Sequence, residues 1–138
     1  MEGKEVGDRI RELLACAGAM DVDGLARFLA PDIVMELPYA PPPFARRHDG
    51  LSAVLAFQRA AAALFSSFRF EVDRVLVVEG ARSVVAEYRS DGVVASSGRP
   101  YRNHYLTVFD LDAGGRVRRW REFYDPAVVK GAFPGERA

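Results

Sequence analysis

Residues 101–126 read YRNHYLTVFDLDAGGRVRRWREFYDP, and this stretch decides the fold. Apolar and polar side chains alternate along residues 101–111 and again along residues 117–124, on either side of the turn sequence AGG. Alternation with a period of two puts successive side chains on opposite faces and is typical of strands with one buried face. The stretch therefore predicts two antiparallel strands joined by a tight turn.

Two further strands precede this pair. Residues 68–77 and residues 84–88 alternate in the same way. Glycine-containing segments at residues 79–80 and 96–98 provide turns between the runs. We therefore expect four successive antiparallel strands in the second half of the chain.

The first half of the chain has helical spacing instead. Apolar residues recur every three or four positions along residues 6–17, 22–29 and 51–67. Asp21 and Asp49 are the expected N-caps of the second and third of these helices. The third segment is the strongest amphipathic helix of the chain.

A short strand and a proline-rich loop lie between the second and third helices. Residues 33–37 are mostly apolar, and residues 38–43 hold four prolines, which cannot continue a helix or a central strand. Helices followed by strands predict an α+β fold, in which a curved sheet wraps around the long helix and leaves an open end for a pocket. The 138 residues fit a single domain over residues 1–138.

The composition argues against several classes of protein. Lys+Arg and Asp+Glu both number 19, so the net charge of +0 gives no reason to expect nucleic acid or an anionic membrane as partner. The single Cys and the two scattered His predict no disulfide framework and no metal site. Phosphate-binding and dinucleotide-binding motifs are absent from the sequence, so we expect no cofactor. With neither a secretory signal nor a roughly 18-residue apolar run, the chain is expected to be cytoplasmic.

Four segments of the sequence resemble a known family. They are PYAPPP at residues 38–43, DGL at 49–51, RPYRNHY at 99–105 and GRVRRWREFYDP at 115–126. Together they resemble the SnoaL-like branch of the NTF2-like superfamily, and the last two strands also resemble its phenazine-biosynthesis proteins. The resemblance implies a cone in which a curved, mixed and mainly antiparallel sheet wraps around N-terminal helices, with an internal pocket. Relatives include polyketide cyclases, ketosteroid isomerase, limonene-epoxide hydrolase and non-catalytic binders.

Glu122 is the leading candidate for chemistry. It shares one face of its strand with Trp120 and Tyr124, because side chains alternate. If that face lines a cavity, apolar surroundings raise the pKa of the carboxyl group and let it exchange a proton near neutral pH. The phenazine-type relatives carry an acid in the matching Arg-Glu-Phe motif. The alternative is a surface carboxylate paired with an arginine, namely Arg102, Arg118 or Arg119.

Further candidates carry polar groups suited to holding a ligand oxygen. Tyr101, Asn103 and Tyr105 share a face of the neighbouring strand. We expect Asn103 and Tyr105 to orient a substrate oxygen, the alternative being that the tyrosines only pack. His48, in the loop, is a further acid–base candidate because imidazole titrates near neutrality, the alternative being a solvated histidine.

Aromatic side chains are expected to form the pocket walls. The expected pocket-lining residues are Tyr39, Phe57, Tyr101, Trp120 and Tyr124. Tyr39 lies beside the proline run and would act as a lid. Glu36 alternates away from its apolar neighbours and is expected to face solvent.

These observations lead to one main hypothesis and two alternatives. The main hypothesis is cofactor-independent acid–base catalysis by Glu122, a cyclisation or isomerisation of a polyketide-like or polycyclic ketone. The first alternative is a non-catalytic module of the same fold that binds a small molecule or dimerises. The second is a hydrolase of the limonene-epoxide type, which needs an Asp–Arg–Asp array that these strands do not provide. The resemblance also implies a small hydrophobic ligand and a homodimer formed through the sheet.

Overall fold

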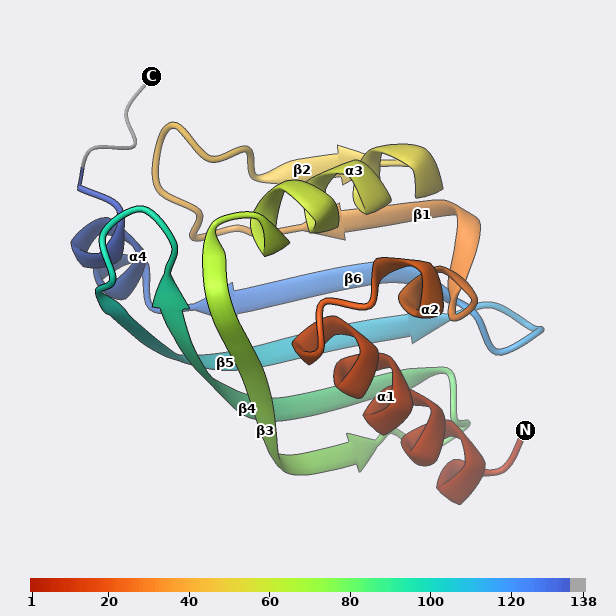
Figure 1. Ribbon diagram of the computed structural model, residues 1–138. Coiled ribbons are helices and arrows are strands. Elements are labelled where there is room, and N and C mark those ends of the chain that lie inside the picture. Colours follow the sequence, from red (N-terminus) through yellow and green to blue (C-terminus); the bar gives the residue numbers. More distant parts are fainter. Residues whose placement is uncertain (135–138) are drawn as a thin grey trace.

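The computed structural model describes residues 1–134, and its architecture is α+β, as the order of elements predicted (Figure 1). The helices are α1 (Gly3–Gly18), α2 (Val22–Ala26), α3 (Leu51–Ala62) and α4 (Pro126–Ala132). The strands are β1 (Leu29–Glu36), β2 (Arg47–Asp49), β3 (Phe65–Val77), β4 (Ser83–Val94), β5 (Pro100–Leu111) and β6 (Val117–Tyr124). None of the helices in residues 1–134 is both long and apolar enough to cross a bilayer.

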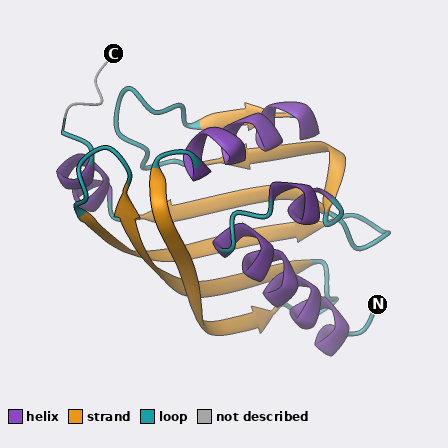
Figure 2. Cartoon of the chain, in the orientation of Figure 1, coloured by secondary structure: helices purple, strands orange, loops and turns teal. Residues whose placement is uncertain are grey.

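All six strands form one mixed sheet in the order β2-β1-β6-β5-β4-β3. Strands β3 to β6 form an antiparallel meander, as expected, whereas β1 pairs in parallel with β6. Helices α1, α2 and α3 cover the same face of the curved sheet, and α4 lies at one end of it (Figures 1 and 2). One face of the sheet is therefore covered by helices and the other is free of them.

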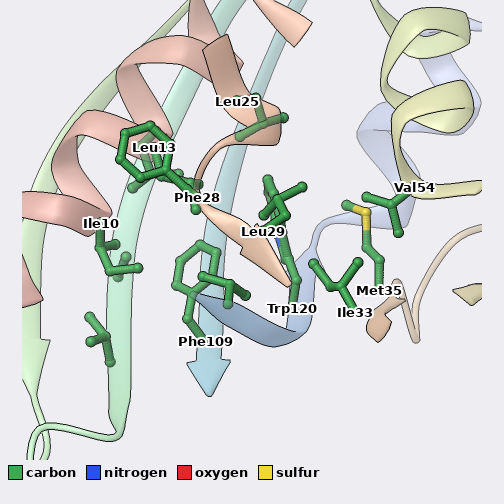
Figure 3. Packing of buried hydrophobic residues seen from close by; sticks show 14 of the residues in the cluster. Ile10, Leu13, Leu25, Phe28, Leu29, Ile33, Met35, Val54, Phe109 and Trp120 are labelled. Carbon is green, nitrogen blue, oxygen red and sulfur yellow. The ribbon is translucent and has the colours of Figure 1, made fainter. Parts of the chain in front are cut away.

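Alternation along the central strands decides which side chains face the helices. In β4 and β5 every second residue is buried along the whole strand. Figure 3 shows how Phe109 of β5 and Trp120 of β6 pack with Ile10 and Leu13 of α1 and Val54 of α3. Burying a large apolar side chain stabilises the fold by about 1.5–3 kcal/mol, so this layer holds helices and sheet together.

The third helix is shorter than its periodicity predicted. It ends at Ala62 rather than at residue 67, and Phe65 already belongs to β3, where it pairs with Val94 of β4. Phe68, which continues the helical spacing in the sequence, also lies in β3, opposite Gly92. Aromatic residues have a high strand propensity, and pairing with β4 overrides the local helical pattern.

The expected cap of this helix is also wrong. Asp49 lies in β2, a short strand inside the expected loop, and its carboxylate binds Arg47 at 3.0 Å. The N-cap is Gly50, whose φ of +88° favours glycine. The cap of α2 is as predicted, since Asp21 accepts a hydrogen bond from the Gly24 amide at 2.9 Å.

Gly18 allows the last turn of α1 to approach β3 closely. A Cβ atom at this position would lie 2.9 Å from the backbone nitrogen of Phe70 and 3.1 Å from its Cβ. Because a backbone atom is the obstacle, a rotamer change of a neighbour does not relieve the clash. Gly18 therefore determines how far Phe70, a residue of β3, stands from the helix.

We predict that Gly18→Ala destabilises the protein by about 1–3 kcal/mol, because the helix must move away from β3. The matched control is Gly131→Ala in α4, where an added Cβ meets nothing within 4 Å. This control is expected to be neutral or to gain up to about 1 kcal/mol from helix propensity. Chemical denaturation measures both free energies of unfolding, and equal values for the two variants would contradict the prediction.

Candidate active site

A cavity of about 400 Å³ lies between the sheet and the helices. Its walls come from the end of α1, the α1–α2 connection, α2, α3, α4, the proline-rich loop and strands β1, β3, β5 and β6. Ten of the described lining residues are aromatic, namely Phe44, Phe57, Phe65, Phe68, Phe70, Tyr101, Tyr105, Trp120, Tyr124 and Phe133. Its volume and apolar walls are typical of a site for a small organic molecule.

Glu122 is buried at the wall of this cavity. Only 9% of the residue is exposed, and none of the ion pairs among the described residues includes it. The Tyr88 hydroxyl donates to Glu122 Oε1 at 2.8 Å and lies 2.7 Å from Thr107 Oγ1. Since a phenol has one proton, Thr107 is the donor in its bond with Tyr88. The two hydroxyls thus form a directed chain that ends at the carboxylate.

Burial and hydrogen bonding act in opposite directions on Glu122. Removal from water disfavours the charged form and raises the pKa of the Glu122 carboxyl above its ordinary value. The hydrogen bond from Tyr88 and the nearby Trp120 indole N–H lower this pKa and offset part of the rise. No hydrogen bond of ordinary geometry reaches the buried Trp120 Nε1 within the described residues. The result is a carboxyl group able to exchange a proton closer to neutral pH than an exposed glutamate.

The cavity wall carries a second polar group, built from tyrosines. Tyr101 and Tyr105 both line the cavity and are 5% and 7% exposed. The Tyr105 hydroxyl donates to that of Tyr101 at 3.3 Å and lies 2.9 Å from Ser90 Oγ. Burial raises the pKa of both phenols, so both hydroxyls keep their protons at neutral pH.

Asn103 is buried beside these tyrosines but does not line the cavity. Its Oδ1 accepts from the amides of His104 at 2.9 Å and Asp125 at 3.1 Å. Its Nδ2 donates to the Asp125 carbonyl at 3.1 Å and to the Tyr101 hydroxyl at 3.0 Å. All four hydrogen bonds of the amide are therefore used, and Asn103 positions Tyr101 instead of binding a ligand directly.

His48 lies outside the cavity lining. It is part of β2, and its ring stacks on Phe57 with the centroids 4.3 Å apart. Burial lowers the pKa of His48, with a smaller opposing effect from Asp49. His48 therefore packs behind Phe57, which lines the cavity, and does not line the cavity itself.

Tyr39 also lies outside the cavity, against the expectation that it forms a lid. It is 54% exposed, and its ring packs edge-on against Phe123 at 5.4 Å. Tyr39 lies in a turn in which the Ala40 amide donates to the Leu37 carbonyl at 3.1 Å. Phe44, at the other end of the proline run, lines the cavity instead.

Glu36, which the alternation of side chains predicted to face solvent, lies on the outer face of the sheet. Glu36 of β1 binds Arg119 of β6 at 2.8 Å and is absent from the cavity lining. Among the described lining residues the only carboxyl groups are Glu122 and Asp21, and none is Lys or Arg. Asp21 is exposed and caps α2, which leaves Glu122 as the buried charge of the cavity.

The most important group that sequence reasoning missed is Tyr88, together with Ser90 and Thr107. A signal was present, since the inward positions of β4 are otherwise apolar from Val84 to Ala86 and then become Tyr88 and Ser90. Hydroxyls on the buried face of a strand need hydrogen-bond partners, and here those partners are Glu122 and Tyr105.

Comparison with known proteins gives a consistent family. A sequence model of the SnoaL-like domain matches residues 10–120. The Bacillus subtilis (strain 168) protein YesE is 28% identical over 134 residues, which cover 97% of this chain and 90% of YesE.

Solved structures give the same answer for the fold. A structure from Bacillus subtilis, named "Putative Isomerase", is 29% identical, covers 99% of both chains and superposes with a TM-score of 0.85. An NTF2-like protein from Burkholderia xenovorans is 22% identical, with coverage of 96% of this chain and 98% of that chain and a TM-score of 0.74. At this lower identity the likeness concerns the fold alone, and it confirms the expected NTF2-like fold.

We predict that Tyr88→Phe raises the pKa of Glu122 further, because the lost hydroxyl is a donor that favours the carboxylate. Carbon-detected NMR titration of the Glu122 side chain measures the shift. The free energy of unfolding is expected to fall by about 1–3 kcal/mol, since Thr107 loses its partner. Tyr39→Phe, at an exposed phenol, is the control and should change neither quantity. An unchanged Glu122 pKa in Tyr88→Phe would show that the bond has no effect on ionisation.

Proposed function

The chain belongs to the SnoaL-like domain family, and from that premise we propose that it is an acid–base catalyst acting on a neutral ketone. The observation that carries the proposal is the buried carboxyl group of Glu122 in the wall of a mostly apolar cavity of about 400 Å³, whose described lining includes ten aromatic residues. The ligand class is a polyketide-like or polycyclic ketone, whose flat apolar body matches the aromatic walls.

The proposed reaction moves one proton. The Glu122 carboxylate removes a proton from the carbon next to the ketone, which leaves an enolate and a protonated Glu122. In an isomerisation Glu122 returns that proton to another carbon of the conjugated system. In an aldol cyclisation the enolate carbon bonds to a second carbonyl carbon, and the resulting alkoxide takes the proton. Both outcomes balance without an oxidant, a reductant or a further reactant.

Other features of the cavity bear on the alternatives. An epoxide hydrolase of the limonene-epoxide type needs an arginine between two aspartates, and the described lining holds no arginine. A non-catalytic binding module would need only the apolar walls. The raised pKa of a buried, hydrogen-bonded Glu122 favours catalysis over simple binding.

Deuterium exchange tests the proposal with α-tetralone, a bicyclic aromatic ketone, as the probe. We predict that the protein accelerates, in D₂O, the exchange of the protons next to the carbonyl of α-tetralone. Proton NMR measures the rate of this exchange. Glu122→Gln should lower the catalysed rate by roughly 10²–10⁴-fold while α-tetralone still binds. The matched control is Glu36→Gln, which removes a carboxylate from the outer face.

Two results would count against the proposal. Exchange in Glu122→Gln at the wild-type rate would remove Glu122 from the reaction. Binding of α-tetralone without faster exchange in the wild-type protein would favour the non-catalytic module.

We also propose that two copies associate through the helix-free face of the sheet. Leu76 of β3 and Leu106 of β5 are large apolar side chains that are 45% and 41% exposed on this face. Charged side chains surround them, including Arg74 and Glu87, which form an ion pair. A face of this kind, apolar with charged neighbours, fits a self-complementary interface.

We predict that Leu106→Lys converts a dimer into a monomer, because a lysine at the interface would lose its water. Sedimentation equilibrium measures the mass. Lys4→Ala, at an exposed residue of α1 that binds Asp8, is the control and should not change the oligomeric state. A wild-type protein that sediments as a monomer would refute the interface.

A further inference from the structure

A directed chain of hydrogen bonds ends at the Tyr101 hydroxyl. The backbone N–H of Asn103 donates to Ser90 Oγ at 3.2 Å, and Ser90 Oγ lies 2.9 Å from the Tyr105 hydroxyl. The Tyr105 hydroxyl donates to that of Tyr101 at 3.3 Å. Because each hydroxyl has one proton, Ser90 must donate to Tyr105. Every proton in the chain therefore points toward Tyr101.

Tyr101 accepts hydrogen bonds but gives none. Its oxygen accepts from Tyr105 and also from Asn103 Nδ2 at 3.0 Å. The hydroxyl proton of Tyr101 has no acceptor within residues 1–134, although only 5% of this residue is exposed. A buried donor without an acceptor is costly unless a bound molecule accepts its proton.

The surroundings hold Tyr101 in place. Its ring packs against Phe65, with centroids 5.2 Å apart, and against Phe133, at 6.0 Å. Asn103, which orients its oxygen, is itself bound to the backbone of Asp125 through two hydrogen bonds. Tyr101 is therefore a fixed donor at the cavity wall, and a fixed donor does not lose free energy by reorienting when a ligand binds.

We propose that the Tyr101 hydroxyl donates a hydrogen bond to the carbonyl oxygen of the ligand, whereas Glu122 takes the proton from the neighbouring carbon. This inference rests on the proposed function and makes it more specific. Two accepted hydrogen bonds polarise the Tyr101 O–H group and strengthen the bond that it donates. The bond strengthens again when negative charge develops on the oxygen during enolate formation. The ligand must then present an acceptor oxygen, and apolar shape alone does not suffice.

The test compares α-tetralone with tetralin, the hydrocarbon of the same shape that lacks the oxygen. Ligand-observed NMR measures the dissociation constant of each compound, and their ratio isolates the contribution of the oxygen. We expect the wild-type protein to prefer α-tetralone by roughly tenfold. Tyr101→Phe should abolish this preference and leave the affinity for tetralin unchanged, which also shows that the cavity is intact.

The direction of the chain predicts a graded series. Tyr105→Phe keeps the terminal donor but removes one bond that polarises it, so about a twofold to threefold loss of the preference is expected. Ser90→Ala, one step further away, should lose less. A Tyr101→Phe variant that still prefers α-tetralone would overturn the proposal. So would a preference that disappears in Trp120→Phe but not in Tyr101→Phe, because the unpaired Trp120 Nε1 is the competing donor.

The role of Glu122 can be tested separately from this one. Glu122→Gln should keep the preference for α-tetralone, because the oxygen is bound by Tyr101. Loss of exchange in Glu122→Gln together with a preference that survives Tyr101→Phe would leave the proposed function intact and refute this inference. Unchanged exchange in Glu122→Gln together with a preference that is lost in Tyr101→Phe would refute acid–base catalysis by Glu122. It would still support Tyr101 as the hydrogen-bond donor to the ligand oxygen.

Discussion

The register between β4, β5 and β6 is the constraint on which the rest of the structure depends. It places Tyr88 opposite Tyr105, and Thr107 opposite Glu122. Because side chains alternate, these residues all face the helices, and a shift of one position would turn every one of them to the other face. The same register therefore produces the apolar core at one end of the sheet and the polar groups of the cavity at the other.

The cavity combines two polar groups that sit in apolar surroundings. One is the carboxyl group of Glu122, which accepts a hydrogen bond from the Tyr88 hydroxyl, and the other is the pair of phenols at Tyr101 and Tyr105. Low polarity around them raises the free energy of the glutamate anion and strengthens hydrogen bonds to a ligand. The proposed proton transfer next to a carbonyl requires a group that takes the proton and a hydrogen-bond donor to the carbonyl oxygen, and both kinds of group lie in the wall of this cavity.

Much of this arrangement was predictable from local patterns. Alternation in residues 101–111 and 117–124 predicted the hairpin and placed Trp120, Glu122 and Tyr124 on one face, which the cavity lining confirms. The spacing failed at α3, because the contacts of Phe65 with β4 come from residues about thirty positions away. Such long-range pairing leaves no mark in a window of neighbouring residues.

The sequence by itself determined the strand periodicity, the α+β order of elements, the family and the face on which Glu122 lies. Only the tertiary structure decided which groups touch it. Tyr88, 34 positions away in the chain, donates a hydrogen bond to Glu122. The side-chain amide of Asn103 donates to the backbone carbonyl of Asp125. Tyr39 turns outward, and His48 stacks behind Phe57. Periodicity defines the side of a strand, whereas hydrogen-bond partners depend on how distant strands and loops approach one another in space.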